Sequence, residues 1–288
     1  MDGEVNHENQ APVLASCFSS DGSTVFTAGA DKAVRMWSLA SQAPNTTAPQ
    51  IGVHDTPVKS VQFISSTNLV VSGGWDKKLK FWDARSPNPV GTLELPERCY
   101  DMDCKGELLV VACANRKMMT YDVRGNPNPS PMMESQLKFQ TRCITAFPDK
   151  SGFAVGSIEG RVGIQYIAKH REKDTFAFKC HRREKQAYAV NAISFNRLGT
   201  LATAGSDGSV TFWDKDNKQR LKTIANIDRC ISCANFNANS DIFAYAASYD
   251  WGKGSSYYAP GQANDIFLHY TPEDEIKPSK SKTNRRNR

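Results

Sequence analysis

Three sets of side chains in this sequence have the types and spacing that nucleophilic catalysis uses. Each set joins a histidine, a serine or threonine, an aspartate and a tryptophan; the sets are His7, Thr27, Asp31 and Trp37, then His54, Ser72, Asp76 and Trp82, then His181, Thr203, Asp207 and Trp213. A histidine between a hydroxyl and a carboxylate can activate that hydroxyl as a nucleophile. An active site needs one such set, whereas this one recurs at nearly constant spacing. We therefore predict a buried hydrogen-bond relay that stabilises a repeated unit, and no enzymatic activity.

These residues lie in one phrase that the chain repeats in several spellings. The clearest copies are TVFTAGADKAVRMWSL, LVVSGGWDKKLKFWDA and TLATAGSDGSVTFWDK. Each copy predicts a β-hairpin, because alternating apolar residues flank an aspartate-led turn. Weaker copies put Asn115 and Glu159 in place of the aspartate, and Tyr121 and Gln165 in place of the tryptophan. The five tryptophan positions are 45, 39, 44 and 48 residues apart, close to the roughly 40 to 45 residues of a four-stranded propeller blade.

A further short strand precedes each hairpin, and a sixth unit follows the fifth. The sixth unit consists of CISCANF, IFAYAASYDW and, after a polar insertion, DIFLHY. The three histidines stand 30, 28 and 32 residues before their tryptophans, a spacing that resembles that of WD-repeat proteins. We expect an all-β WD-repeat β-propeller over residues 1–270, with six repeat units. Residues 271–288 are charged and poor in apolar side chains, so we expect a mobile tail there.

Composition excludes several classes of protein. Hydrophobic residues make up 40% of the 288 residues and charged residues 23%, and no apolar run reaches the roughly 18 to 20 residues of a membrane span. The start, MDGEVNHENQ, has no secretory signal, so we expect a nuclear or cytoplasmic protein whose eight cysteines stay reduced, mostly in the core. Cys230 and Cys233 should face opposite sides of a strand. We therefore expect no metal, cofactor or small-molecule substrate.

The net charge of +6 gathers at particular positions of the repeat. Cations follow the turn residue in four consecutive units, and arginine precedes a cysteine at three strand starts; these residues are Lys32, Lys77, Lys78, Arg116, Lys117 and Arg161, then Arg98, Arg142 and Arg229. Both sets are expected on one rim, with Glu159 as the only interrupting acid. Such a surface attracts an acidic peptide or a phosphate backbone. Arg161 is the expected anchor because it follows a glycine, and Trp251 is either a partner-facing or a packed aromatic.

Longer phrases point to one family. QTRCITAFPDKSGFAVGSIEGRV, GGWDKKLKFWDAR, ELPERCYDMD and ASYDWGKG resemble the mRNA export factor family of the nuclear pore, which is of the Rae/Gle type, over about residues 7–278. The resemblance implies a seven-bladed propeller, so the six units indicate that the first blade is lacking. It also implies binding of the GLEBS segment of a nucleoporin, with Arg161 paired to an acid. Export of polyadenylated mRNA, a possible mitotic spindle role and a location at the nuclear pore, with some protein in the cytoplasm, are implied as well.

RNA contact is a further expectation of this resemblance. The sequence has no RNA-recognition motif with stacking aromatics, so we expect the basic surface to hold phosphates with little sequence preference.

Two other readings stay open. A mitotic checkpoint propeller that binds GLEBS-like segments of kinetochore kinases shares the SIEGRV and KCHR phrases, although ASYDWGKG matches the export factor better. A substrate receptor of a ubiquitin ligase is the second alternative, because Trp82-Asp83-Ala84-Arg85 has the Trp-Asp-x-Arg pattern that contacts a ligase adaptor.

Overall fold

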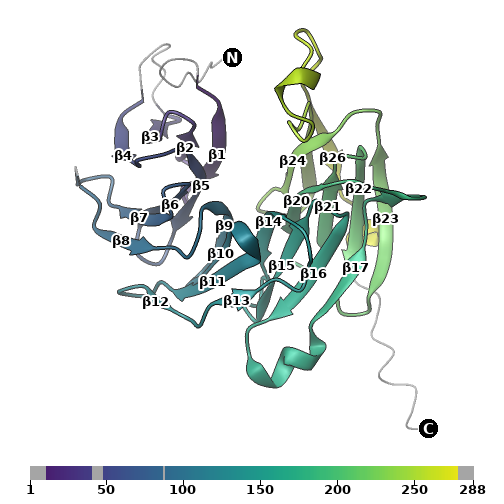
Figure 1. The fold of residues 1–288 in the computed structure, drawn as a ribbon, viewed down its shortest axis with the longest axis horizontal. Helices are drawn as coiled ribbons and strands as arrows, with labels where there is room; N and C mark the ends of the chain where they lie inside the picture. Colours follow the sequence, from purple (N-terminus) through teal and green to yellow (C-terminus); the bar gives the residue numbers. More distant parts are fainter. Residues whose placement is uncertain (1–10, 41–47, 87, 278–288) are drawn as a thin grey trace. The chain divides into compact units, whose positions relative to one another are not determined.

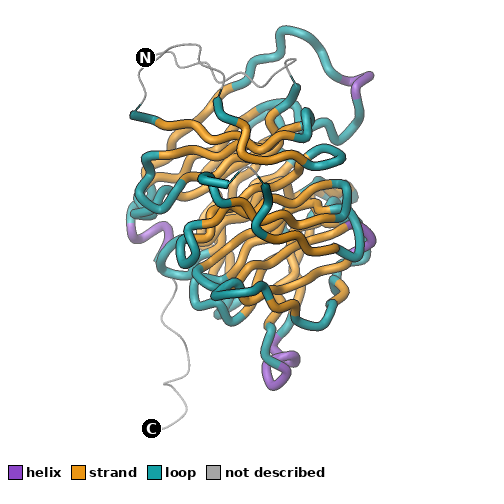
Figure 2. The backbone as a smooth tube through the Cα atoms, turned by 90° about the vertical axis from the view of Figure 1, so that its left-hand side faces the viewer, coloured by secondary structure: helices purple, strands orange, loops and turns teal. Residues whose placement is uncertain are grey.

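The protein is built from short antiparallel strands, with little helix (Figure 1). The computed structural model describes residues 11–40, 48–86 and 88–277. The chain divides into two compact units, Met1–Ser135 and Gln136–Arg288. In both units the longer strands of each main sheet pair in chain order. Loops join these strands (Figure 2). The predicted all-β class is confirmed. Among the described residues, no helix has the length and apolar character that crossing a membrane requires.

The first unit contains three sheets. The first sheet comprises β1 (Val13–Phe18), β2 (Thr24–Gly29), β3 (Ala33–Ser38) and β4 (Gln50–Val53). The second comprises β5 (Val58–Ile64), β6 (Leu69–Gly74), β7 (Lys78–Trp82) and β8 (Gly91–Glu94). The third comprises β9 (Cys99–Lys105), β10 (Leu108–Cys113) and β11 (Lys117–Asp122), with β12 (Asn128–Pro129) and β13 (Met133–Glu134) both paired to β11. A single 3-10 turn, Ala114–Arg116, links β10 to β11.

The second unit contains three more large sheets. The fourth sheet comprises β14 (Thr141–Ala146), β15 (Gly152–Ser157), β16 (Arg161–Tyr166) and β17 (Phe176–Lys179). The fifth comprises β20 (Val190–Phe195), β21 (Leu201–Gly205), β22 (Ser209–Asp214) and β23 (Gln219–Asn226), and the sixth β24 (Ile231–Phe236), β25 (Ile242–Ala247) and β26 (Asp265–Tyr270). Smaller elements are the hairpin β18 (Arg182–Arg183) and β19 (Gln186–Ala187), the 3-10 turns Lys169–Asp174 and Ser255–Tyr257, and α1 (Glu273–Ile276).

Neighbouring sheets within each unit pack face to face, which explains why their middle strands are apolar on both sides. All residues of β15 and of β21 are buried. One core cluster joins the first sheet to the second, through residues such as Val34 and Trp82, and another joins the second to the third. In the second unit, clusters likewise join the fourth sheet to the fifth and the fifth to the sixth. Face-to-face packing of meander sheets is how the blades of a propeller bury their surfaces.

A β-bulge recurs near the start of the first strand of each of the six large sheets. The pairing skips one residue there, and the skipped residues are Leu14, Lys59, Tyr100, Arg142, Asn191 and Ser232. A bulge bends its strand and turns the extra side chain to a new direction. Because all six sheets share this irregularity, they are copies of one structural unit.

The sixth sheet departs from the others at its outer side. Among the described residues it has three strands, and the third, β26, leaves Ile266, Leu268 and Tyr270 between 69% and 78% exposed. The chain after β26 packs on the fifth sheet. The Ile276 carbonyl accepts a hydrogen bond from the Thr200 hydroxyl, and the Ile276 side chain is buried. Of the predicted mobile tail, residues 271–277 are described and include the buried Ile276, and residues 278–288 lie outside the described part of the chain.

Candidate functional site

The turn between the second and third strands has one backbone geometry in five sheets. The residue after the acidic or amide turn residue has a left-handed φ between 60° and 74°; these residues are Lys32, Lys77, Arg116, Gly160 and Gly208. The carbonyl of each accepts a hydrogen bond from the chain that enters or leaves the outer strand; the donors are the N–H groups of His54, Leu95, Ser135, Cys180 and Ile227. The five turns are therefore equivalent, and each fixes the position of the side chains that follow it.

The second sheet contains a complete relay of buried polar groups. His54 Nδ1 lies 2.9 Å from Asp76 Oδ2, His54 Nε2 lies 2.7 Å from Ser72 Oγ, and Trp82 Nε1 donates to Ser72 Oγ at 2.7 Å. One proton arrangement satisfies every group: Trp82 N–H donates to Ser72, Ser72 O–H to His54 Nε2, and His54 Nδ1–H to Asp76. Burial lowers the pKa of His54, partly offset by Asp76, which agrees with a neutral ring.

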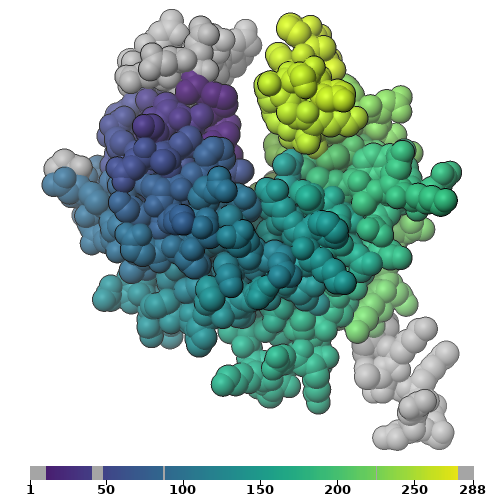
Figure 3. All heavy atoms as spheres, in the orientation of Figure 1, coloured from purple at the N-terminus to yellow at the C-terminus, as the bar shows by residue number. Residues whose placement is uncertain are grey.

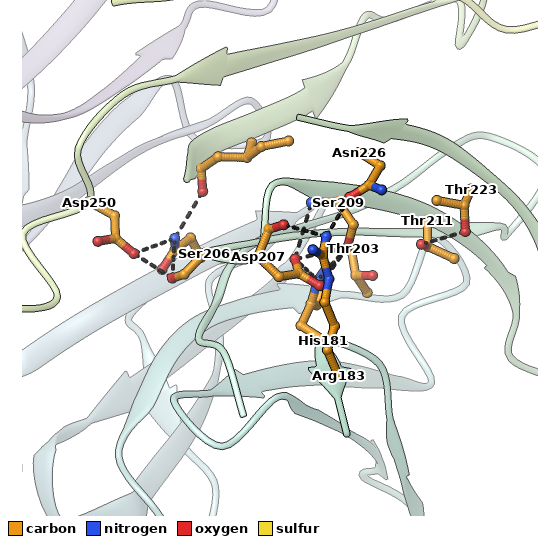
Figure 4. A network of polar contacts seen from close by, with 12 residues as sticks. His181, Arg183, Thr203, Ser206, Asp207, Ser209, Thr211, Thr223, Asn226 and Asp250 are labelled. Atoms are coloured by element: carbon orange, nitrogen blue, oxygen red, sulfur yellow. Dashed lines mark hydrogen bonds and ion pairs between the residues drawn. The ribbon is translucent and has the colours of Figure 1, made fainter. Parts of the chain in front are cut away.

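The fifth sheet has a related but interrupted relay (Figure 4). His181 Nδ1 lies 2.8 Å from Asp207 Oδ1, and the Ser209 hydroxyl contacts both groups. Trp213 Nε1 donates to Thr203 Oγ1 at 2.9 Å, but His181 Nε2 has no hydrogen-bond partner among the described residues. Burial alone would raise the pKa of Asp207, yet hydrogen bonds from His181 and Ser209 together with the His181 charge lower it below its ordinary value.

In the first sheet the structure shows the two ends of the relay. Trp37 Nε1 donates to Thr27 Oγ1 at 2.8 Å, and Asp31 forms an ion pair with the buried Arg35. His7, the remaining member, lies outside the described residues.

Burial decides what these relays can do. Ser72 and Thr203 are both 0% exposed, and the histidines beside them are 1% exposed. A catalytic hydroxyl must meet its substrate, so these side chains act in folding rather than in chemistry. The eight cysteine thiols are all free; three are buried, four are partly buried and Cys233 is exposed.

Carboxylates from other loops reach the predicted cations of the first unit. Lys77 Nζ lies 2.6 Å from Glu97 and Lys78 Nζ 3.0 Å from Asp55, while Arg116 pairs with Glu134 and Arg98 lies 4.0 Å from Glu97; Lys32 is exposed and Lys117 half-buried. The prediction that Glu159 is the only acid among these cations is therefore wrong. The acids enter from loops about 20 residues away, so the turn sequences alone do not contain them.

The three arginines that precede cysteines do not share one register, and their placement on one rim stays a prediction. Arg98 precedes the strand, Arg142 occupies the bulge of β14, and Arg229 stands two residues before β24. The bulge turns Arg142 inward, where its Nη2 donates to Asn191 Oδ1 at 2.9 Å and to the Asp250 carbonyl at 3.3 Å. Arg229 pairs with Asp265 and donates to the Ala263 carbonyl. These two side chains support loops of the second unit.

A cationic cluster forms around Gly160 in the second unit. Arg161 and Lys179 stand directly opposite each other on β16 and β17, and Arg182 Nε donates to the Glu159 carbonyl at 3.0 Å. Like charges in cross-strand positions repel each other. The nearest carboxylate, Glu159, lies 3.5 Å from Arg161 Nε and balances one of the three charges. We call Arg161, Lys179 and Arg182 the cationic cluster; sequence reasoning found only Arg161, because β17 was not placed beside β16.

An aromatic hollow lies beside this cluster on the same unit. It is lined by Phe176, Phe178, Trp213, Lys215 and Lys218, among others. The Phe178 and Trp213 rings are 4.9 Å apart between centroids, and Lys218 Nζ lies 4.4 Å from the centre of the Phe176 ring. Sequence reasoning missed this hollow, although the alternation FAFK was its visible signal.

The Trp-Asp-x-Arg pattern has a local structural role. Arg85 folds back on Asp83, with Nε and Nη2 at 2.8 and 2.6 Å from its two oxygens, and lowers the pKa of Asp83 to about 2. The same turn recurs where Arg124 folds back on Asp122. The pattern is therefore a repeated turn of these sheets.

Comparisons with known proteins agree with this geometry. The family model described as WD domain, G-beta repeat matches residues 4–38, 48–83 and 173–214. Together with the repeated sheets, this match defines a WD40-repeat β-propeller, with six blades among the described residues. The predicted propeller class is confirmed.

Three relatives identify the family. Protein Rae1 of Drosophila melanogaster is 46% identical over 279 residues, which cover 93% of this chain and 79% of the relative. The mRNA export factor of Pongo abelii is 49% identical over 286 residues, covering 94% and 76%. Protein RAE1 of Arabidopsis thaliana is 43% identical over 275 residues, covering 95% and 77%. The chain belongs to the Rae1 family of mRNA export factors, as the sequence resemblance predicted.

Proposed function

We propose that this chain is a non-enzymatic scaffold that binds an acidic GLEBS segment of a nucleoporin and supports export of polyadenylated mRNA from the nucleus. The cationic cluster of the second unit is the observation that carries this proposal. Three cations lie around the turn at Gly160, and the Glu159 carboxylate pairs with Arg161 of the three. Relatives named mRNA export factor support the export role.

An acidic partner would relieve the repulsion within this cluster. Arg161 and Lys179 face each other across two strands, and the Arg161 side chain is 33% exposed, so its guanidinium can reach a bound carboxylate. A charge-assisted, two-pronged contact to a carboxylate is among the strongest that an arginine makes. Losing such an anchor from a peptide interface commonly costs about 2 kcal/mol of binding free energy.

The aromatic hollow offers a second contact for the same segment. Its walls are aromatic, and Lys218 lies over the Phe176 ring, whereas Lys215 is buried and pairs with Asp216. It therefore suits an apolar side chain with acidic neighbours, and its place in the same unit as the cationic cluster favours one extended segment that contacts both.

The burial of the relay hydroxyls supports a scaffold role, because a buried hydroxyl does not meet a substrate. The Ser72 and Thr203 hydroxyls are fully buried, whereas the cationic cluster and the aromatic hollow present cations and aromatic rings that suit binding. We propose a location in the nucleus and at the nuclear pore, with some of the protein in the cytoplasm, and relatives named mRNA export factor support this location. The spindle role implied by the family resemblance stays a prediction. The adaptor-binding alternative stays a prediction: the Arg85 side chain is 84% exposed and pairs with Asp83 in a turn that recurs at Asp122.

Titration with a fluorescently labelled GLEBS peptide tests the proposal. The wild-type chain is compared with Arg161→Glu and with a control, Arg197→Glu. The control reverses the charge of an exposed arginine in the loop between β20 and β21, outside the cationic cluster. We expect Arg161→Glu to raise Kd by about thirtyfold or more, equivalent to about 2 kcal/mol, and Arg197→Glu to leave it unchanged. Circular dichroism confirms that all three chains are folded. Failure of the folded wild type to bind, or equal losses in both variants, would reject the proposal.

A peptide from a kinetochore kinase separates the checkpoint alternative from the export role. Tighter binding of the kinase peptide than of the nucleoporin peptide, with the same dependence on Arg161, would favour the checkpoint role.

A further inference from the structure

Two positions on the third strand of a sheet show which face packs on the next sheet. In the fifth sheet Val210 and Phe212 of β22 are buried against residues of the sixth sheet, such as Ile231 and Phe236. Residues two apart on a strand lie on the same face. The pairs at these positions in the first, second and fourth sheets also pack on the sheet that follows; they are Val34 and Met36, Leu79 and Phe81, and Val162 and Ile164. We call this side of a sheet its outgoing face.

The outgoing face of the sixth sheet has the same apolar character but is uncovered. Ile266 stands opposite Ala246 in β25, as Val210 stands opposite Ala204 in β21, so the two positions are equivalent. Ile266 is 78% exposed and Leu268, two residues on, is 71% exposed. The loop that precedes β26 protrudes from the second unit, in yellow in Figure 3, and leaves both side chains in contact with water.

The first sheet carries the opposite half of such a contact. In the second, fifth and sixth sheets, a valine or isoleucine before the bulge of the first strand and a phenylalanine five residues later pack on the preceding sheet; these pairs are Val58 and Phe63, Val190 and Phe195, and Ile231 and Phe236. Val13 and Phe18 occupy these positions in β1, and they are 45% and 61% exposed. We call this side of a sheet its incoming face.

The chain therefore exposes both halves of a contact that its described sheets bury within each unit. None of the four exposed side chains, Val13, Phe18, Ile266 and Leu268, is charged. Apolar groups gathered on one face are unfavourable in water and indicate an interaction surface. A flat sheet face is best covered by another sheet, and the chain itself contains a sheet face with the matching residue types. A second copy of the chain thus supplies the complementary half.

We propose that the outgoing face of the sixth sheet packs on the incoming face of the first sheet of a second copy of this chain. The contact repeats, between two chains, the sheet-on-sheet packing that the core clusters show within each unit. Because the two faces differ, copies add head to tail until the assembly closes. The inference stands apart from the proposed peptide binding, since the cationic cluster belongs to neither face.

Sedimentation velocity of the full chain measures this association between about 1 and 100 μM, the range over which contacts with micromolar Kd dissociate. A reducing agent is present, because the Cys233 thiol is exposed and can form disulfides between chains. The wild type is compared with Ile266→Lys, Phe18→Lys and Val90→Lys. Val90 is the matched control, because it is 54% exposed between β7 and β8 and belongs to neither face.

Circular dichroism shows whether each variant is folded. Ile266→Ser and Phe18→Ser, which remove apolar surface without adding a charge, replace any lysine variant that unfolds.

We expect the average mass of the wild type to rise with concentration. Ile266→Lys and Phe18→Lys should each weaken association at least about tenfold, because the contact would bury an unpaired charge. Val90→Lys should associate as the wild type does. An equimolar mixture of Ile266→Lys and Phe18→Lys should form a one-to-one pair that neither variant forms alone, because the mixture retains one intact face of each kind. The pair should grow no further, since its remaining faces both carry lysine.

A wild-type chain that stays monomeric over this range overturns the inference; a partner of another kind on these faces would give that result. Association that survives in Ile266→Lys or in Phe18→Lys also overturns it, because the contact then lacks one of the two faces. A mixture without pairs shows that the two faces are not partners. An equal loss in Val90→Lys would assign the effect to added charge instead of to the faces, and would reject the proposed contact.

Discussion

Removing the Ser72 hydroxyl should destabilise the protein far more than removing the equivalent hydroxyl of Thr203. Ser72 Oγ serves two buried groups, Trp82 Nε1 and His54 Nε2, each at 2.7 Å. Ser72→Ala leaves both without a partner, and each unsatisfied buried group costs about 1–3 kcal/mol, so the free energy of unfolding should fall by about 2–6 kcal/mol. Thr203 serves Trp213 alone, whose ring is partly exposed. Thr203→Val should therefore cost only about 1–2 kcal/mol.

Urea unfolding followed by tryptophan fluorescence and by circular dichroism measures the difference. Both probes are needed because the two units need not unfold together, and a stability is defined only where the transitions coincide. The reasoning would be refuted by equal losses in the two variants, or by a cost of less than about 1 kcal/mol for Ser72→Ala.

Three further predictions concern the turns, the relay histidine and the free edge. Lys77→Gly should leave the free energy of unfolding unchanged or raise it by about 0.5–1 kcal/mol, because glycine adopts the φ of 62° without strain. Gly208→Lys should lower it by more than about 2 kcal/mol, because the new Cβ would stand 1.8 Å from the Ile227 carbonyl oxygen. The urea midpoints of the two variants test both expectations. Burial lowers the pKa of His54, so the neutral His54 ring contributes fully to stability above the ordinary histidine pKa near 6.5. As pH falls below that value, the free energy of unfolding should decrease by at most about 1.4 kcal/mol per pH unit. His54→Gln should flatten this part of the pH profile of stability, and an unchanged profile would contradict the prediction. Leu268→Lys should reduce concentration-dependent association measured by light scattering, because a charge on an exposed apolar edge strand opposes strand pairing, and unaltered association would exclude β26 as the contact.

The repeated unit could be predicted from the sequence because its determinants are local. The turn aspartate and the tryptophan six residues later fix the register of each hairpin, and the structure pairs Trp82 with Val70 and Trp213 with Leu201 as equivalent positions. The period of the phrase then gave the number of sheets. Even the weak copies followed, since Gln165 pairs with Phe153 at the same place in the fourth sheet.

Much of the candidate site depends on contacts between residues far apart in the sequence. Arg142 donates to the carbonyl of Asp250, 108 residues away, because it occupies a β-bulge. The residue types around Arg142 do not predict this bulge. The Lys179 side chain joins Arg161 only once β17 is aligned with β16. The stacking of Trp251 on Tyr258 likewise needs the loop conformation, since the intervening residues, GKGSSY, give no periodic pattern. Charge and residue type suggested candidates, while the pairing of strands decided their neighbours.

A charge-swap titration tests the central claim most directly, namely that the cationic cluster around Gly160 holds an acidic segment. Wild-type and Arg161→Glu chains are each titrated with the GLEBS peptide and with a peptide in which one acidic residue is replaced by arginine, taking each acid in turn. If the proposed contact exists, one substituted peptide binds the wild type weakly but regains at least about tenfold in affinity with Arg161→Glu, as paired charges do in double-mutant cycles. If no substituted peptide regains affinity with Arg161→Glu, the acidic segment is not held at Arg161 and the proposed site is wrong.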